Sequence, residues 1–220
     1  MISGNGAAGR QAGQRDRPQL VIGLTGPIGC GKTAVAGYLA ARGGWRIDAD
    51  DVAREVTGPG RPELAAIRTR FGDAVFAADG SLDRTALAAL VFPDPVALAE
   101  LEAIVHPAVG LLVRERLAEA AAAGAPVIVM EAIKLVESGL TAACDEVWLV
   151  ECSPAVQRAR LVGRGMTPGD AERRIAAQGA DLADRLAPFA TRRIVTDGTL
   201  QDAEQRVTAA LTETLDRQDR

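Results

Sequence analysis

The sequence predicts an α/β fold, a parallel sheet with helices on both faces, and two observations carry this prediction. First, short apolar runs alternate along the chain with segments of helical periodicity, which is the pattern of strand–helix–strand units. Second, the apolar run 20–26 (LVIGLTG) leads through a glycine-rich loop into the helix-spaced segment 32–43. A buried strand that feeds a helix in this way is typical of parallel sheets. The 220 residues suffice for one such domain with insertions.

The remaining elements follow in order along the chain. Residues 45–50 (WRIDAD) form a second short strand, and a helix begins after them near Val52. Residues 58 to about 123 contain no convincing strand and three helical patterns. Strands resume at three apolar runs, 125–132, 145–152 and 193–198. An arginine-rich helical stretch at 154–180 separates the last two of them. An amphipathic helix at 201–216 closes the chain.

This order divides the chain into a core, an insertion and a tail. Residues 1–17 are polar and glycine-rich, and we expect a disordered tail there. The core comprises 18–57 and 125–220, with a helical lid at about 154–180. The helical insertion at 58–124 is the candidate substrate-binding subdomain.

Bulk composition excludes several classes of protein. A net charge of −4 and a pI near 5.2 argue against a general nucleic-acid binder. No apolar run approaches the roughly 20 residues that span a bilayer, so no membrane partner is expected. The three cysteines, Cys30, Cys144 and Cys152, show no metal-type pairing, and we expect reduced thiols in a cytoplasmic protein. We expect a monomer that at most self-associates weakly.

The firmest signal is a phosphate-binding loop. Gly26-Pro27-Ile28-Gly29-Cys30-Gly31-Lys32-Thr33 satisfies the pattern G-x-x-x-x-G-K-[ST]. Glycines let the backbone curl so that its N–H groups converge, and the next helix adds the positive end of its dipole. Lys32 then reaches the β- and γ-phosphates, and the Thr33 hydroxyl is a ligand for Mg²⁺. The alternative is a plain glycine turn, which the strand before and the helix after disfavour. We expect a nucleoside triphosphate and Mg²⁺ here.

The rest of the sequence separates a kinase from a switch GTPase. No Asn-Lys-x-Asp motif exists, whereas a small-substrate kinase needs a base for the acceptor hydroxyl. Asp48 and Asp50 end the second strand, where spacing i, i+2 places both on one face. Asp50 is a candidate base, but Asp50 or Asp51 capping the following helix explains the same residues equally well.

Two further groups of residues stay ambiguous from spacing alone. Arg160 and Arg164 share a helical face and suit phosphate oxygens, although a solvated face paired with Asp170 and Glu172 explains them as well. Thr167, before a proline, predicts a helix start that makes a helix–turn–helix lid. Glu131 ends an apolar strand, either holding a Mg²⁺-bound water or standing there incidentally. A lone His106 is more often structural than catalytic.

Taken together, these motifs resemble those of the dephospho-coenzyme A kinase family over about residues 19–200. The matching segments are GLTGPIGCGKT, IDADDVAREV, RFGDAVFAADGSLDRTALAALVFPDP, LEAIVHP, LVESGL and CDEVWLVECSPAVQRARLVGRGMT. The combination is specific, whereas the phosphate loop alone is not. The resemblance implies a P-loop kinase fold of the nucleoside-monophosphate-kinase type, which transfers the ATP γ-phosphoryl to the ribose 3′-hydroxyl of dephospho-CoA.

The resemblance also assigns roles to residues. It makes Asp50 the catalytic base, Lys32 and Arg160 catalytic cations, and Arg164 a lid contact to ATP. Nucleotide binding falls on Ile28, Gly29, Cys30, Gly31, Lys32 and Thr33. Acceptor binding falls on Thr25, Asp50, Arg54, Phe71, Leu82, His106, Pro107 and Leu135.

The sequence departs from the family pattern at four places. Pro27 replaces a glycine and removes one loop donor, and Thr33 replaces a serine but keeps the hydroxyl. Lys134 replaces an apolar residue near the acceptor site, and the turn 196–198 (TDG) replaces a usual Asn. Two alternatives therefore stay open. One is a kinase of similar fold for another nucleoside or small alcohol, and the other is a nucleotide- or CoA-binding regulator without turnover.

Overall fold

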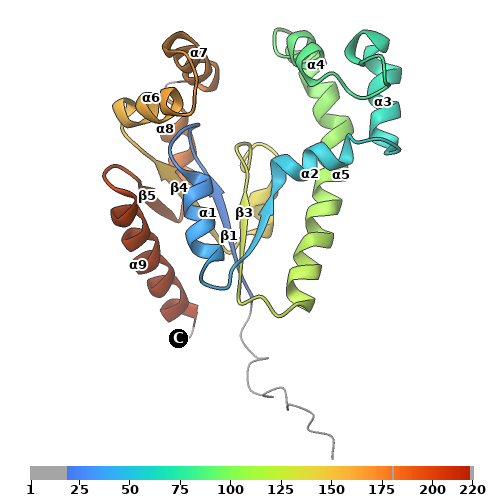
Figure 1. Ribbon diagram of the computed structural model, residues 1–220. Coiled ribbons are helices and arrows are strands. Elements are labelled where there is room, and N and C mark those ends of the chain that lie inside the picture. The colour runs from blue at the N-terminus through green and yellow to red at the C-terminus, as the bar shows by residue number, and fades with distance from the viewer. Residues whose placement is uncertain (1–18, 180, 219–220) are drawn as a thin grey trace, which may run out of the picture.

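A computed structural model describes residues 19–179 and 181–218, and the predicted tail at 1–17 lies outside them. Within that part of the chain the architecture is the predicted one, a parallel five-stranded sheet in the order β2-β3-β1-β4-β5 between helices (Figure 1). The strands are β1 (Leu20–Thr25), β2 (Trp45–Asp48), β3 (Val127–Glu131), β4 (Glu146–Glu151) and β5 (Arg192–Val195).

Helices cover both faces of the sheet. The helices are α1 (Lys32–Ala40), α2 (Ala49–Val56), α3 (Pro62–Phe71), α4 (Arg84–Val91), α5 (Pro95–Ala122), α6 (Pro154–Gly163), α7 (Pro168–Gln178), α8 (Leu182–Leu186) and α9 (Leu200–Gln218). On one face α1 and α9 pack on alternate residues of β1, and on the other α2 and α5 pack on β3. Because side chains alternate between the two faces along each strand, the sheet contributes residues to one hydrophobic cluster on each face.

The carboxyl ends of the strands open between two lobes. One lobe, which we call the acceptor lobe, consists of α3, α4 and the first half of α5 (Figure 1). The other is the lid, α6 and α7, on the opposite side of the sheet end. The lid starts as predicted, because the Thr167 side chain accepts a hydrogen bond from the Asp170 amide and Pro168 opens α7.

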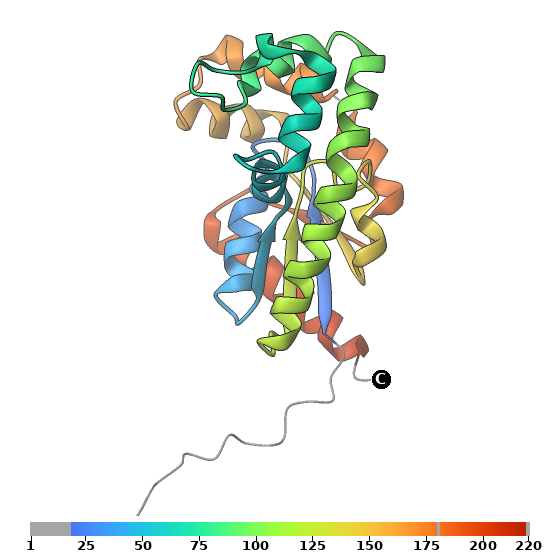
Figure 2. The same ribbon diagram turned by 90° about the vertical axis from the view of Figure 1, so that its right-hand side faces the viewer.

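Helix α5 serves both the acceptor lobe and the core, as its length in Figure 2 makes plain. Its first half packs into the cluster of α3 and α4 through Ala97, and its second half packs on the sheet through Val109, Leu112 and Val113. The predicted boundary at residue 124 stays a prediction. By length and composition alone α5 is apolar enough to cross a membrane, so the expectation that no run approaches that length was wrong.

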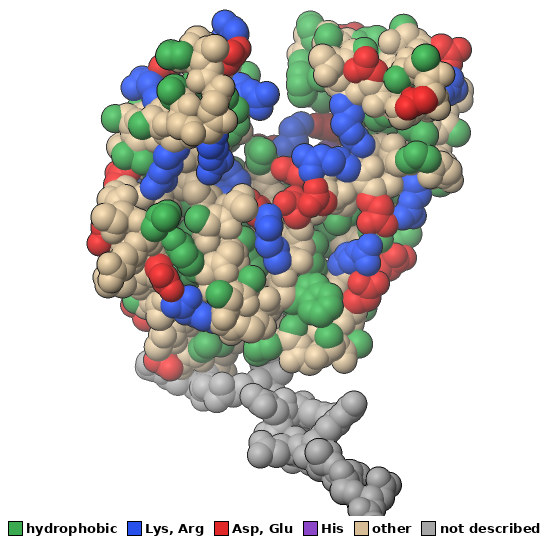
Figure 3. All heavy atoms as spheres, viewed as in Figure 1, with side chains coloured by type: hydrophobic (Ala, Val, Ile, Leu, Met, Phe, Trp, Pro, Cys, Tyr) green, Lys and Arg blue, Asp and Glu red, His purple; other side chains and the backbone are tan. Residues whose placement is uncertain are grey.

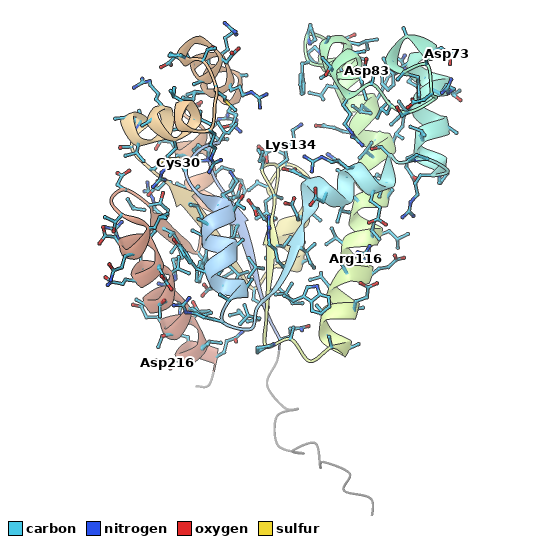
Figure 4. The ribbon with its side chains drawn as sticks, in the orientation of Figure 1. Cys30, Asp73, Asp83, Arg116, Lys134 and Asp216 are labelled. Atoms are coloured by element: carbon cyan, nitrogen blue, oxygen red, sulfur yellow. A yellow bond between two sulfur atoms is a disulfide. The ribbon has the colours of Figure 1, made fainter. Side chains whose placement is uncertain are left out.

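The cysteines correct a second expectation. Cys30 and Cys152 form a disulfide, with Cα atoms 5.1 Å apart, instead of two reduced thiols. They lie 122 residues apart in sequence but meet because β1 and β4 are neighbours and end at the same edge of the sheet. Figure 4 shows Cys30 at this edge, beside the lid. Cys144 is free, and burial raises the pKa of its thiol to about 12, so it is a weak nucleophile.

Candidate active site

The phosphate loop joins β1 to α1 and curls as the motif predicts. Gly29 and Gly31 have φ values of 80° and 90°, a left-handed conformation that suits glycine. Gly31 is the residue before α1, so the loop delivers its N–H groups to the start of that helix. A side chain at Gly29 is also excluded by packing, since its Cβ would lie 3.1 Å from Leu161 Cγ on α6.

Lys32 is nearly buried at the first position of α1. Its Nζ donates to the Gly26 carbonyl oxygen at 2.7 Å and to that of Pro27 at 3.2 Å. Burial lowers the pKa of Lys32, while the charges of Glu131 and Asp50 act in the opposite direction. A cation held in this way has neutral carbonyl partners, which anionic phosphate oxygens outcompete.

A hydroxyl and a carboxylate meet beside the lysine. Thr33 Oγ1 donates to Glu131 Oε1 at 2.8 Å, and Arg46 donates to Glu131 Oε2 at 2.9 Å. Oxygen donors of this kind suit Mg²⁺, which keeps most of its waters and is otherwise held by phosphates. Among residues 19–179 and 181–218 no group of three His, Cys, Asp or Glu side chains could hold a metal by itself. The residues present therefore fit a metal that arrives with a nucleotide.

Asp48, at the end of β2, and Asp50, just after it, have different roles, which the sequence did not reveal. The strand ends at Asp48, which caps α2 by accepting from the amides of Asp50 and Asp51 at 3.0 and 3.3 Å. The expected shared strand face was wrong, and so was capping by Asp50 or Asp51, because α2 begins at Ala49. Asp50 thus lies in the first helical turn, with its carboxylate facing the cleft.

Charges around Asp50 set its proton affinity. Partial burial, and then the negative charge of Asp48, raise the pKa of Asp50, while Arg54 and Lys32 act to lower it. A raised pKa makes an ionised aspartate a stronger base than it is in water.

One cavity brings these residues together. It lies between the phosphate loop, the start of α2 and the lid, and Figure 3 shows charged side chains gathered at the bottom of the gap between the lobes. Its lining residues are Ile28, Gly29, Gly31, Lys32, Thr33, Asp48, Asp50, Arg54, Glu131, Ile133 and Arg164.

A sequence profile of dephospho-CoA kinases matches residues 20–202 of the chain, which covers every residue of this cavity. The chain belongs to the dephospho-CoA kinase family.

Individual relatives agree with this membership. A dephospho-CoA kinase of Streptomyces avermitilis is 48% identical over 191 residues, which cover 86% of this chain and 90% of that protein. A crystal structure from Thermus thermophilus, 33% identical, superimposes with a TM-score of 0.75 over 89% of this chain and 97% of the other. The dephospho-CoA kinase structure from Campylobacter jejuni, 22% identical, has a TM-score of 0.64 over 88% and 96% and shares the fold.

For this dephospho-CoA kinase family member, the structure places the predicted residues in two groups. The cavity is lined by the predicted residues of the loop other than Cys30 and by Asp50, Arg54 and Arg164. Arg160 lies beside it, donating to Thr196 Oγ1 at 2.9 Å and to the Thr196 carbonyl oxygen at 2.7 Å. Eight residues fall outside the lining: Thr25, Cys30, Phe71, Leu82, His106, Pro107, Leu135 and Arg160.

The residues outside the lining belong mostly to packed cores. Phe71 and Leu82 lie in the acceptor lobe's cluster, and Leu135 is fully buried against the sheet. Thr25 is buried and donates to the Ile133 carbonyl oxygen at 3.3 Å. The sequence reading missed Asp48 and Ile133 as lining residues. The Asp-x-Asp spacing contained the signal for Asp48, but no local signal marked Ile133.

Proposed function

We propose that this chain transfers the γ-phosphoryl group of ATP to the 3′-hydroxyl of dephospho-CoA, the last step of coenzyme A biosynthesis. One observation carries the proposal: Asp50, Lys32 and Thr33 line one cavity between the phosphate loop, the start of α2 and the lid. A kinase with this arrangement can hold a triphosphate on one side and a hydroxyl acceptor on the other. Family membership supplies the identity of the acceptor.

The triphosphate is held by the later part of the loop. Pro27 has no N–H, and the Ile28 N–H donates to Gln178 Oε1 at 2.8 Å, so neither residue is a free donor. The proposed phosphate donors are the amides from Gly29 to Thr33, together with Lys32 Nζ. Of these, the Cys30 N–H donates a long hydrogen bond to the Pro27 carbonyl oxygen at 3.4 Å, which a phosphate oxygen would replace. Mg²⁺ would be held by Thr33, with Glu131 beside it, and would neutralise phosphate charge.

Asp50 takes the proton of the acceptor hydroxyl. Capping by Asp48 leaves Asp50 lining the cleft, and its raised pKa makes the ionised carboxylate a stronger base than an ordinary aspartate. Arg164, on the lid, lies over the same cavity and stabilises the charge of the transferring phosphoryl group. Arg160, anchored to Thr196 beside the loop, contributes a second cation.

We assign acceptor recognition to Arg54 on α2 and to the acceptor lobe. Arg54 lines the cavity close to Asp50 and is ion-paired with Asp51. We assign Phe71 and Leu82 an indirect role: they pack the lobe and thereby shape the acceptor pocket. Thr25, His106, Pro107 and Leu135 complete the proposed set.

The deciding experiment is a coupled ADP-release assay with purified protein, ATP and Mg²⁺. We expect turnover with dephospho-CoA and little with nucleoside monophosphates, shikimate or small alcohols. Preference for another acceptor would make the chain a kinase of different specificity. Binding of both ligands without ADP production would indicate a regulator.

The same proposal includes the protein's state in the cell. We propose a cytoplasmic monomer that binds neither nucleic acid nor membranes, in keeping with its acidic pI of about 5.2. Packing of Val109, Leu112 and Val113 of α5 on the sheet supports this, because these apolar residues are used within the fold. Light scattering tests whether the protein is a monomer, and a vesicle-sedimentation assay tests whether it binds membranes.

A further inference from the structure

Both backbone polar groups of Ile28 are engaged by side-chain amides of the lid. The Ile28 N–H donates to Gln178 Oε1 at 2.8 Å, and Gln157 Nε2 donates to the Ile28 carbonyl oxygen at 2.8 Å. Gln157 lies on α6 and Gln178 is the last residue of α7, so each lid helix contributes one amide. A single loop residue is thus clamped from two directions.

The amides are themselves held in place. Gln157 is 8% exposed, and its backbone oxygen would lie 3.2 Å from a Cβ at Gly29, so loop and helix touch without a side chain between them. The Gln178 carbonyl oxygen accepts from Arg185 at 2.9 Å. Arg185 belongs to α8, which packs on Leu149 of the sheet through Leu182 and Leu186.

These contacts connect the nucleotide side to the lid. Ile28 directly precedes the amides that cradle the phosphates in the proposed function, and Arg164, which lines the cavity, directly follows the last residue of α6. The position of Arg164 relative to a bound γ-phosphate therefore depends on how α6 and α7 sit on the loop. Small errors in such positions are costly, since about 1 Å of misplacement can reduce turnover by up to about 10²-fold.

We propose that Gln157 and Gln178 are positioning residues for phosphoryl transfer, holding the phosphate loop and the lid in register through Ile28. They act through the loop and through Arg164 and contact no substrate. The proposal rests on the kinase activity proposed above.

The two amides have opposite polarity, and this allows a sharp test. Gln178 accepts a hydrogen bond, so Gln178→Glu keeps the contact, whereas Gln178→Met removes it at similar size. Gln157 donates, so both Gln157→Glu and Gln157→Met remove the contact. We expect kcat to fall about tenfold in Q178M, Q157M and Q157E, and to stay within about threefold of wild type in Q178E.

The measurement is the initial rate of ADP release with saturating dephospho-CoA, together with the ratio of ADP formed to acceptor phosphorylated. A misplaced lid admits water, so we expect this ratio to rise above one in the three impaired variants. The KM for dephospho-CoA should change less than about twofold. Gln201→Met, an exposed substitution on α9, is the matched control and should change nothing.

Melting temperatures separate positioning from folding. Assays run well below the melting point of each variant, and where a Gln157 variant does not fold, the pair Q178E and Q178M decides. Equal loss in Q178E and Q178M, or kcat within about twofold of wild type in Q178M and Q157M, would overturn the proposal. A wild-type protein without dephospho-CoA-dependent ADP release would instead refute the proposed function.

Discussion

The phosphate-loop side and the acceptor lobe are stabilised by different kinds of contact. Around the loop, buried polar contacts predominate: Cys30 is 1% exposed, and its carbonyl oxygen accepts from Thr196 Oγ1 at 2.7 Å. The acceptor lobe has its own hydrophobic cluster, including Ile67 and Phe71, with solvent-exposed ion pairs such as Arg70–Glu100 around it. The phosphate-loop side positions backbone N–H donors, and the acceptor lobe presents side chains.

This difference implies different sensitivities to substitution. Substitutions on the phosphate-loop side should reduce catalysis or the stability of the whole fold, because a buried polar group that loses its hydrogen-bond partner there stays unpaired. Changes on the acceptor lobe's surface should act weakly and mainly on acceptor affinity. The following predictions test the contrast, beginning with the largest effect.

Lys32→Met should give the largest loss. We expect kcat to fall by about 10³-fold, because a buried cation next to the phosphates is removed. Lys134→Met is the matched control, since these are the two lysines of the chain: Lys32 lines the cavity, and Figure 4 shows Lys134 between the lobes. Steady-state ADP release measures both. Similar kcat losses in the two variants would contradict the contrast.

Asp50→Asn should lower kcat by about 10²-fold or more. Since the pKa of Asp50 is raised, the acid limb of the pH–kcat profile should lie at higher pH than an ordinary aspartate gives, and the variant should lose this limb. Asp51→Asn, at the next position, is the control and should keep the limb.

The same variant makes a prediction about stability. A raised pKa means that the folded protein binds the Asp50 proton more tightly than the unfolded chain does. Ionised Asp50 therefore lowers stability above its folded pKa, and this cost disappears at acid pH. Asp50→Asn should melt at a higher temperature than wild type at pH 7, with the difference shrinking toward acid pH.

Loss of the disulfide should act on folding more than on chemistry. Cys152→Ser should lower the free energy of unfolding by about 2 kcal/mol or more, because the bond closes a long loop in the unfolded chain. Urea unfolding of the oxidised protein measures this. Cys144→Ser, with or without reductant, is the control. Two additional thiols titrating in the oxidised wild-type protein would show that the bond does not form.

The smallest effect is expected where the two sides meet. Lys134 Nζ lies 2.8 Å from Glu102 on α5, and both side chains are partly exposed, so Glu102→Gln should cost less than about 1 kcal/mol. Figure 4 shows Lys134 between the lobes. Because Lys134 replaces an apolar residue near the proposed acceptor site, we expect Lys134→Met to raise the KM for dephospho-CoA a few-fold and to leave the KM for ATP unchanged. A larger change for ATP would place Lys134 on the nucleotide side.

The same contrast explains what could be predicted from the sequence. The sheet, the loop and the lid helices follow from periodicity, glycine spacing and capping, which are local properties. Asp50 was misplaced on the strand because Asp48, by capping α2, ends the strand that extended spacing would continue. The Cys30–Cys152 bond and the Thr196 contacts join residues far apart in sequence, so they depend on strand order, which local patterns do not specify.

Helix α5 adds a mechanical consequence. The acceptor lobe's cluster includes α5 residues as far as Val105, which also packs against the sheet's cluster, and the buried sheet-packed residues of α5 begin at Val109. Pro107 lies inside the helix where these two clusters meet. A proline inside a helix removes one backbone hydrogen bond and is the commonest place for a helix to bend. A bend at Pro107 would therefore change the angle between the acceptor lobe and the sheet, because α5 joins the two at this position.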